Sequence, residues 1–250
     1  MPFFALIKKE TYRFTSIWIQ TIVGPLSTAL LYQLIFGTQM SAVSTCVGQI
    51  SYSTYLIPGL VMMQILLNSF GNSSSSLIQS KYLGNIIFIL MAPISVFGMY
   101  FAYLLASILR GLIVGGAVLA GIIWFGNFPP LQIWALLYFA LVGAAITGGL
   151  GIIAGILCEK FDQLAGVQSF VMVPLIYLSG IFFNTAHFSP LWRSIAMLDP
   201  FLYIVDGFRY GFIGHASFHL PFGVVFVLVF ALIVNGCGIM LLKRGVKIKH

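Results

Sequence analysis

The side chains that could bind a metal or transfer a proton are few and scattered along this chain of 250 residues. Three of the four histidines and two acids fall within residues 185–219, whereas the three cysteines lie far apart. There is no His-Glu-x-x-His zinc motif, no cysteine pair and no Gly-x-Ser-x-Gly nucleophile motif. The phosphate-binding loop Gly-x-x-x-x-Gly-Lys-Ser/Thr is also absent. The sequence therefore predicts no catalytic, metal or cofactor site in this chain.

Two charges in residues 185–219 have a spacing that suggests a structural role. Asp206 and Arg209 lie three positions apart within the largely apolar residues 203–212, and residues at this spacing share one face of a helix. Because an unpaired charge in apolar surroundings is costly, the two side chains are predicted to neutralise each other and to help close an outer gate. The alternative is a solvated helix on which the pair has no role.

Arg110 is a third charge at an unusual position, because apolar residues surround it within residues 104–112. A charge at mid-membrane costs a few kcal/mol on insertion scales, so Arg110 should face the helix bundle or a wet cavity. Two interpretations remain open. Arg110 is either a polar anchor in a substrate path or a structural donor to backbone, Ser or Gln groups.

The composition indicates which elements must position these side chains. Hydrophobic residue types make up 60% of the chain, charged types only 7%, and the mean hydropathy is +1.05. Soluble domains carry about 25% charged residues. Residues 14–80, 111–158 and 210–242 contain no Asp, Glu, Lys or Arg. These stretches exclude a soluble enzyme, a disordered chain and a secreted disulfide scaffold, and they predict an all-α membrane protein.

The apolar stretches divide into six predicted transmembrane helices within a single domain, residues 1–250. The predicted spans are residues 19–37, 54–73, 95–123, 133–157, 164–184 and 220–242. Residues 3–18 combine an apolar side that includes Phe14 with a basic side that includes Arg13. This pattern predicts an interfacial amphipathic helix whose basic side faces anionic headgroups, with a polar extension of the first span as the alternative. A further short helix is predicted along the inner surface within residues 76–92.

Small residues recur every four positions in two of the spans. They are Gly143, Thr147, Gly151 and Gly155 in the fourth span, and Gly111 and Gly115 in the third. Because small residues at this spacing let helix backbones approach closely, these faces are predicted to pack within the chain, with a contact between subunits as the alternative.

The distribution of lysine and arginine predicts the orientation. With both termini in the cytoplasm, nine of the 12 basic residues lie inside, two lie outside, and Arg110 lies within the membrane. The formal net charge of +7 is therefore interpreted as a marker of cytoplasmic membrane flanks and not as a nucleic-acid surface.

Four stretches of the chain together resemble one known family. They are residues 13–37 with Gly24-Pro25, residues 55–63 with Pro58-Gly59, residues 170–180, and residues 198–212 with Asp206-Gly207-Phe208-Arg209-Tyr210. With its size and its six spans, the chain resembles the permease subunits of ABC exporters of the second type. That group includes drug-resistance, nodulation-factor and polysaccharide-export permeases.

The resemblance implies partners and a place in the cell. Such permeases lie in the bacterial inner membrane, form dimers, here with a second copy of the chain, and sit on two separately encoded ABC ATPase subunits. ATP and magnesium belong to those subunits. Helix 3–18, the inner helix and the turn after the fourth span would contact the ATPase, and residues 185–219 would form short re-entrant helices that close the outer face. By position, the coupling residues would be Asn85, Ile87, Phe88, Glu159, Lys160 and Asp162.

One departure from the family concerns the inner helix. Many relatives carry acidic residues a few positions before Ala92-Pro93, whereas residues 86–90 are all apolar here. Either the partner ATPase matches this apolar surface, or the coupling is altered or lost.

The transport path is predicted to lie between two protomers and to be lined by the first, second and fifth spans without any charge. This prediction favours a hydrophobic or amphipathic cargo such as a drug, a lipid or a lipid-linked glycan. An ATP-independent secondary transporter or channel would need ionisable residues at membrane depth, where only Arg110 qualifies. A membrane-embedded enzyme would need the outer cluster of His187, Asp199, Asp206, His215 and His219.

Overall fold

The computed structural model describes the chain except for residues 1, 38–44, 47–49, 129–130, 183–188 and 246–250. The described part is built of helices, apart from the two-residue strands β1 (Thr45–Cys46) and β2 (Ile50–Ser51), which pair antiparallel. The helices are α1 (Pro2–Thr15), α2 (Trp18–Tyr32), η1 (Gln33–Gly37), α4 (Tyr52–Tyr82), α5 (Ile86–Met91), α6 (Val96–Ile122), η2 (Ile123–Phe125), α7 (Ile133–Leu157), α8 (Phe161–Val167), η3 (Gln168–Met172), α9 (Val173–Leu178), α10 (Pro190–Met197), α11 (Pro200–Ile213) and α12 (Leu220–Arg244).

Six helical segments of the described residues are long and apolar enough to cross a membrane, which confirms the all-α fold class. The fourth span is Ile133–Leu157, as predicted, and the third and sixth spans agree within two residues at each end. The fifth span is composite, because α8, the π-helical turn η3 and α9 follow one another from Phe161 to Leu178. Its predicted end at residue 184 lies outside the described residues.

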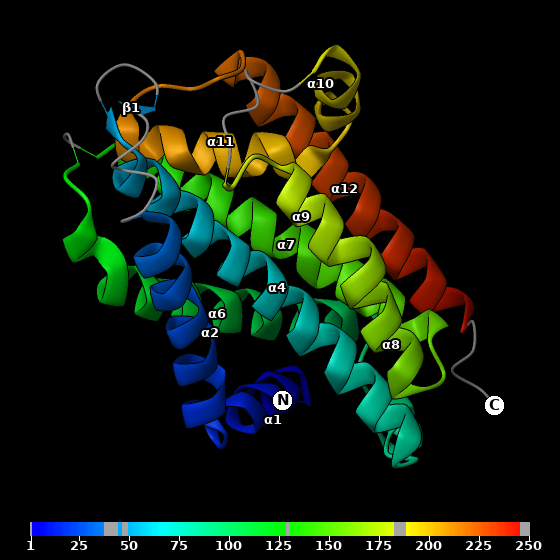
Figure 1. The fold of residues 1–250 in the computed structure, drawn as a ribbon. Coiled ribbons are helices and arrows are strands. Elements are labelled where there is room, and N and C mark those ends of the chain that lie inside the picture. The colour runs from blue at the N-terminus through cyan, green and yellow to red at the C-terminus, as the bar shows by residue number, and fades with distance from the viewer. Residues whose placement is uncertain (1, 38–44, 47–49, 129–130, 183–188, 246–250) are drawn as a thin grey trace.

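The short elements gather at the two ends of the bundle (Figure 1). Helix α1 crosses one end, where α4 and α12 also end and α5 and α8 begin. Helices α10 and α11 cross the opposite end. We call these the α1 end and the α11 end.

Helix α4 is nine residues longer than the predicted second span at its C-terminal side, because it continues to Tyr82. The Ser73–Ser76 run lies inside this helix and does not open a loop. The hydroxyls of Ser73, Ser74 and Ser75 donate to carbonyls of the preceding turn, as Ser74 Oγ does to Phe70 O at 2.7 Å, and Ser76 donates to the Glu10 carboxylate of α1, so the serines stay satisfied within the protein. The predicted short helix within residues 76–92 is present as Ile86–Met91, after Gly84 turns the chain at a φ of 70°, while residues 76–82 continue α4.

The centre of the bundle is α4, which packs against α6, α7 and α11. In α4, 83% of the apolar window is buried, compared with 17% in the first span and 17% in the fifth. The small residues predicted to pack do face this helix. A Cβ on Gly155 of α7 would lie 3.1 Å from Ser74 O, and one on Gly111 of α6 would lie 3.0 Å from Ile65 O. The prediction of packing within the chain is therefore confirmed.

Helix α1 is packed more deeply than an interfacial helix. Phe14, which was predicted to enter lipid, is buried in the protein, and Glu10 is completely buried. Arg13 points into the bundle and bonds to α4, so the prediction that it faces headgroups is wrong. The reason is that α4 extends far enough to offer α1 a polar partner surface.

Replacing Gly151 with alanine should test the α4–α7 contact. A Cβ there would collide with the Phe70 carbonyl oxygen, which is backbone and cannot rotate away, so we expect a loss of about 1–3 kcal/mol. The control is Gly236→Ala in α12, where nothing lies within 4 Å of the added atom and the helix should be unchanged or slightly more stable. Thermal unfolding of both purified variants in one detergent gives the comparison, and equal midpoints would contradict the close contact.

Candidate functional site

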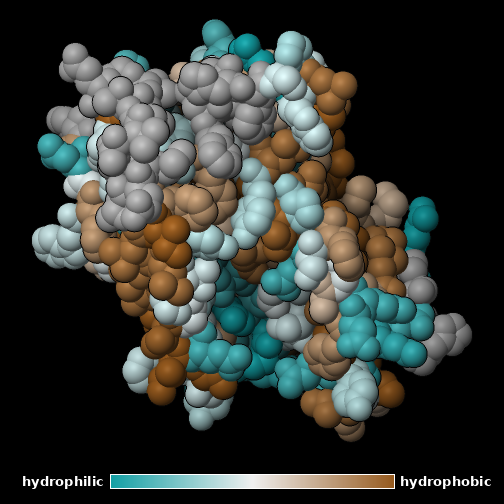
Figure 2. Space-filling view, in the orientation of Figure 1, coloured by the Kyte–Doolittle hydropathy of each residue, from teal (hydrophilic) through white to brown (hydrophobic). Residues whose placement is uncertain are grey.

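A cavity of about 610 Å³ lies between the first and fifth spans, with α4 behind it. Figure 2 shows hydrophilic surface gathered in a hollow on this face, beside the hydrophobic surface of α2. Its arginine, amide and serine lining comes from the four elements α1, α4, α6 and η3 and consists of Arg13, Gln64, Asn68, Ser75, Arg110 and Gln168. Residues of the first, second and fifth spans line this cavity, and α1 and α6 each contribute an arginine to it. The predicted path between two protomers stays a prediction.

Helix α4 supplies a polar stripe to the cavity wall. Gln64, Asn68 and Asn72 are spaced four residues apart, so they lie on one face of the helix. Gln64 and Asn68 line the cavity, and Asn68 Nδ2 donates to Gln64 O at 3.0 Å. Sequence reasoning missed this stripe, although the spacing of the three amides in an apolar span was a readable signal.

Arg13 is tied to α4 by several bonds. Its Nη2 donates to Asn72 O at 2.8 Å and to Asn72 Oδ1 at 2.9 Å, and its Nη1 donates to Ser75 Oγ at 3.3 Å. Its Nε donates to Glu10 Oε2 at 3.2 Å, and Ser76 donates to the same carboxylate oxygen. This network satisfies the Arg13 guanidinium and its charge, and it joins α1 to the centre of the bundle.

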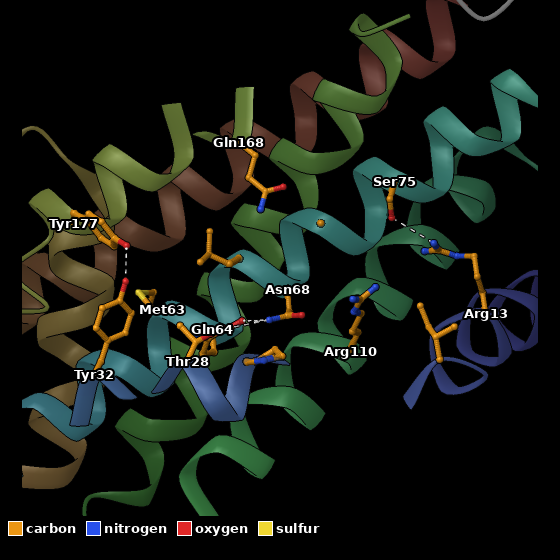
Figure 3. A pocket seen from close by; sticks show the side chains of 14 residues that line it. Arg13, Thr28, Tyr32, Met63, Gln64, Asn68, Ser75, Arg110, Gln168 and Tyr177 are labelled. Carbon is orange, nitrogen blue, oxygen red and sulfur yellow. Dashed lines mark hydrogen bonds between the residues drawn. The ribbon is translucent and has the colours of Figure 1, made fainter. Parts of the chain in front are cut away.

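Arg110 projects from α6 into the same cavity (Figure 3). Its Nη1 lies 3.5 Å from Asn72 Oδ1, the acceptor that Arg13 also uses. Its buried Nε has no hydrogen-bond partner in the described part of the chain. None of the five acidic residues, all of which are described, forms an ion pair with Arg110. The bond to Asn72 fits the interpretation of Arg110 as a structural donor. Its position beside a cavity, with unpaired N–H donors, fits the interpretation of Arg110 as a polar anchor in a substrate path.

Aromatic side chains close the cavity toward the α11 end. The hydroxyls of Tyr32 in α2 and Tyr177 in α9 are 3.3 Å apart, so they bridge the two walls (Figure 3). The Phe182 ring packs against both, with centroid distances of 5.4 Å to Tyr32 and 5.5 Å to Tyr177. The cavity thus has a cationic, amide-rich part near α1 and an aromatic part near α9.

Lys81 holds the end of α7 against the end of α4. Its Nζ donates to the carbonyl oxygens of Gly155, Ile156 and Cys158 at 3.1, 2.8 and 2.7 Å. These are the last carbonyls of α7, which lack partners within the helix and carry its negative dipole end. This clamp places the turn at Glu159 and Lys160 beside α4.

The predicted coupling residues lie at the α1 end and are exposed. Asn85 precedes α5, Ile87 and Phe88 lie in α5, Glu159 and Lys160 lie in the turn before α8, and Asp162 lies in its first turn. An exposed apolar surface surrounds them, which we call the α5 patch. It consists of Tyr82, Leu83, Ile87, Phe88, Met91 and Phe161. The rings of Tyr82, at the end of α4, and Phe161, at the start of α8, have centroids 6.1 Å apart, so the patch extends from α5 across the end of α4 to α8.

At the α11 end, Arg209 binds backbone oxygens of two other segments. It donates to Gly180 O at 2.9 Å, Ile181 O at 3.5 Å and Tyr55 O at 3.4 Å, and its guanidinium carbon lies 3.8 Å from the centre of the Tyr55 ring. A Cβ on Gly59 would lie 3.3 Å from Arg209 Nη2, so the glycine leaves room for this side chain. The Pro58-Gly59 and Asp-Gly-Phe-Arg sequences therefore meet in space.

Asp206 does not form the predicted ion pair with Arg209. Its Oδ2 accepts from the backbone N–H groups of Ser217 and Phe218, at 2.8 and 3.2 Å, and no contact within 4 Å joins the two charges. Each side chain reaches the nearest unpaired backbone groups, which lie on different sides of α11. Burial raises the pKa of the Asp206 carboxyl, while the Arg209 charge and the two N–H groups lower it.

Asp199 caps the start of α11. Its Oδ1 accepts from Phe201 N at 2.9 Å, whereas its buried Oδ2 has no partner in the described residues. Burial raises the pKa of this carboxyl to about 7, against the lowering effect of the Phe201 N–H. His187, another member of the predicted outer cluster, lies outside the described residues, which contain no group of three or more His, Cys, Asp or Glu able to hold a metal.

Five spans around a sixth, central one, a polar cavity on one face and short helices at both ends are an arrangement suited to a transport subunit of a membrane. Residues 1–213 match the family described as ABC-2 type transporter, and the chain belongs to that family. It is 36% identical to the inner membrane transport permease YadH of Escherichia coli K12 over 230 residues, 90% of each chain. It is also 25% identical to nodulation protein J of Neorhizobium galegae over 209 residues, 78% of this chain and 75% of the relative.

Exchanging the charges of Asp206 and Arg209 should not restore what the single changes remove. Because Arg209 faces carbonyl oxygens and Asp206 faces N–H groups, the variant Asp206→Arg/Arg209→Asp places each charge against groups of its own sign. We expect Asp206→Ala and Arg209→Ala each to cost about 1–3 kcal/mol. The exchange should cost at least as much as both together. Thermal unfolding measures this, and a double variant more stable than either single one would indicate a direct ion pair.

The Asp199 carboxyl predicts a pH dependence of stability. Its pKa is about 7 in the folded chain, above the ordinary 3.8, so the folded state binds more protons between these values. Stability contributed by the protonated group is therefore lost as pH rises toward 7 and beyond. Asn also caps helices but does not titrate. Between pH 5 and 8, the unfolding midpoint of Asp199→Asn should fall less than that of the original chain, and parallel curves would contradict the raised pKa.

Proposed function

We propose that this chain is the permease subunit of an ATP-driven ABC exporter of the bacterial inner membrane, with both termini in the cytoplasm. The observation that carries the proposal is the cavity between α2 and the fifth span, in a chain of the ABC-2 type transporter family. Its polar floor and aromatic end suit an amphipathic substrate such as a drug, a lipid or a lipid-linked glycan. The relative names support membrane transport, since one is an inner membrane transport permease.

A second copy of the chain is the proposed partner within the membrane. The first and fifth spans flank the cavity and are the least buried of the walls, with only 17% of each apolar window covered. Exposed apolar side chains follow both, including Val23 and Leu31 in α2 and Phe170 and Val171 in η3. A homodimer that joins these faces would cover them and turn two open cavities into one enclosed path.

The ATPase is proposed to be a separate subunit that binds ATP and magnesium and docks at the α1 end. The α5 patch supports this assignment, because Phe88 and Met91 of α5 are 73% and 78% exposed. An exposed apolar patch at a membrane surface marks an interaction site. The clamp of Lys81 on the end of α7 gives a docked subunit a rigid connection to the central helix.

Reconstitution tests the function directly. The chain is placed in vesicles with a separately produced candidate ABC ATPase, and movement of a fluorescent amphiphile is followed with and without ATP. We expect ATP-dependent movement with both subunits and neither movement nor ATP hydrolysis with the permease alone. Movement by the permease alone along an ion gradient would contradict the proposal and favour a secondary transporter.

Phe88→Asp should uncouple this system. An aspartate in the α5 patch would have to be desolvated on docking, and truncation of a central interface aromatic commonly costs 2 kcal/mol or more, so we expect ATP-dependent transport to fall at least about tenfold. Phe88→Leu keeps an apolar contact and serves as the control. Both variants should insert and unfold like the original chain, because Phe88 lies on the surface. Unchanged transport in Phe88→Asp would place the docking site elsewhere.

A further inference from the structure

We propose that the cavity binds the phosphate headgroup of an anionic amphiphile, with Arg110 as its principal ligand. This inference rests on the proposed function and narrows the substrate to one charge type. The chain binds the headgroup within the membrane and does not rely on ordinary surface attraction to acidic lipids.

The two arginines of the cavity have different electrostatic situations. The Arg13 charge is offset by Glu10, and its donors are directed at Glu10, Asn72 and Ser75. The Arg110 charge has no acidic partner within 4 Å in the described residues, and one long bond to Asn72 is its recorded contact. The cavity therefore carries a net positive charge centred on Arg110.

An arginine without a counter-ion at membrane depth is energetically costly, so such residues usually have a function. A bound anion supplies one, because a phosphate accepts two parallel N–H bonds from a guanidinium and also neutralises it. A guanidinium has five N–H donors, and the recorded bond of Arg110 uses one of them, from Nη1 to Asn72 Oδ1, so its Nη groups keep donors for such a bidentate contact. Arg13 is fixed at the shared acceptor Asn72, so its guanidinium occupies part of the acceptor capacity that would otherwise bind Arg110.

The remaining walls fit the rest of an amphiphile. Gln168 of η3 extends from the wall opposite α4 toward the cavity and offers an amide to the headgroup (Figure 3). Farther from α1, Pro25, Met63 and Leu67 form apolar wall, and the Tyr32–Tyr177 bridge ends the space. A volume of about 610 Å³ lies within the usual size of pockets for small ligands, roughly 300–1,000 Å³. A single-chain lipid can thus place its phosphate at Arg110 and its chain along the aromatic end.

Binding can be measured without ATP or a partner subunit, so this test and the exporter test fail separately. The purified full chain is titrated with lauroyl lysophosphatidic acid, and bound molecules are counted by native mass spectrometry. Monolauroylglycerol has the same chain without phosphate, and inorganic phosphate has the same anion without the chain. We expect saturable binding of the lysophosphatidic acid only, and at least about tenfold weaker binding in Arg110→Gln.

Three further variants keep the test decisive. Arg244→Gln removes an exposed arginine at the end of α12 and should bind like the original chain, which controls for lipid held on the outer surface. Arg110→Lys should retain part of the affinity, since it keeps the charge but loses the paired donors. Asn68→Asp leaves Arg110 in place, adds a competing carboxylate to the cavity wall and should also weaken binding.

Several results would overturn the inference. Folded Arg110→Gln and Asn68→Asp proteins that both bind lysophosphatidic acid normally would remove Arg110 from the site. Equal binding of monolauroylglycerol would show that the chain alone is recognised. Equal binding of inorganic phosphate would make the site one for a soluble anion and contradict the amphiphile.

Discussion

The close contact between α4 and α7 is the constraint on which the other features depend. The glycine face of α7 lets the two backbones meet, with the Cβ position of Gly155 only 3.1 Å from Ser74 O. Helices α6, α7 and α11 pack against α4. The helix therefore lies at the centre of an apolar protein, and its serine and amide side chains form their hydrogen bonds inside the chain. Its α11 end meets Arg209, and its α1 end carries Lys81 and leads into the α5 patch. One rigid helix therefore connects both ends and forms the back of the cavity.

Four cations lie in or beside the bundle, and they are satisfied in different ways. Arg209 and Lys81 bind backbone carbonyls at the ends of other helical segments, where unpaired acceptors gather. Arg13 is held by Glu10 and Asn72. These three connect elements that are distant in sequence, and removing any of them would leave buried acceptors or a buried carboxylate without a partner. Arg110 forms one long hydrogen bond, to Asn72, and lines the cavity. This difference distinguishes a candidate binding group from the three structural cations.

Hydropathy alone predicted the six spans well, because an apolar run has to match the thickness of the bilayer. It failed where a polar run continues a helix, since the hydroxyls of Ser73, Ser74 and Ser75 find acceptors inside α4 and that of Ser76 finds one in Glu10 of α1. The spacing of Asp206 and Arg209 correctly placed both on one helix but not their partners, which are backbone groups of residues 180–181 and 217–218. The charged cavity was missed because Arg13 and Arg110 are 97 positions apart, and only the fold brings both to Asn72.

The walls of the cavity differ in how firmly they are held. Helix α4 is enclosed by α6, α7 and α11, so moving it would break contacts on every side. Helix α2 and the fifth span are mostly uncovered, and each includes a π-helical segment, η1 or η3, together with a proline at residue 25 or 174. Such segments carry fewer regular helical bonds and bend at a lower cost. Separating Tyr32 from Tyr177 breaks one hydroxyl contact and the packing of Phe182, whereas separating α4 from α7 would disrupt the core of the bundle. A change in the width of the cavity is therefore least costly as a movement of α2 and α9 about a fixed α4, and in that movement Arg110 stays in place while the wall that faces it opens.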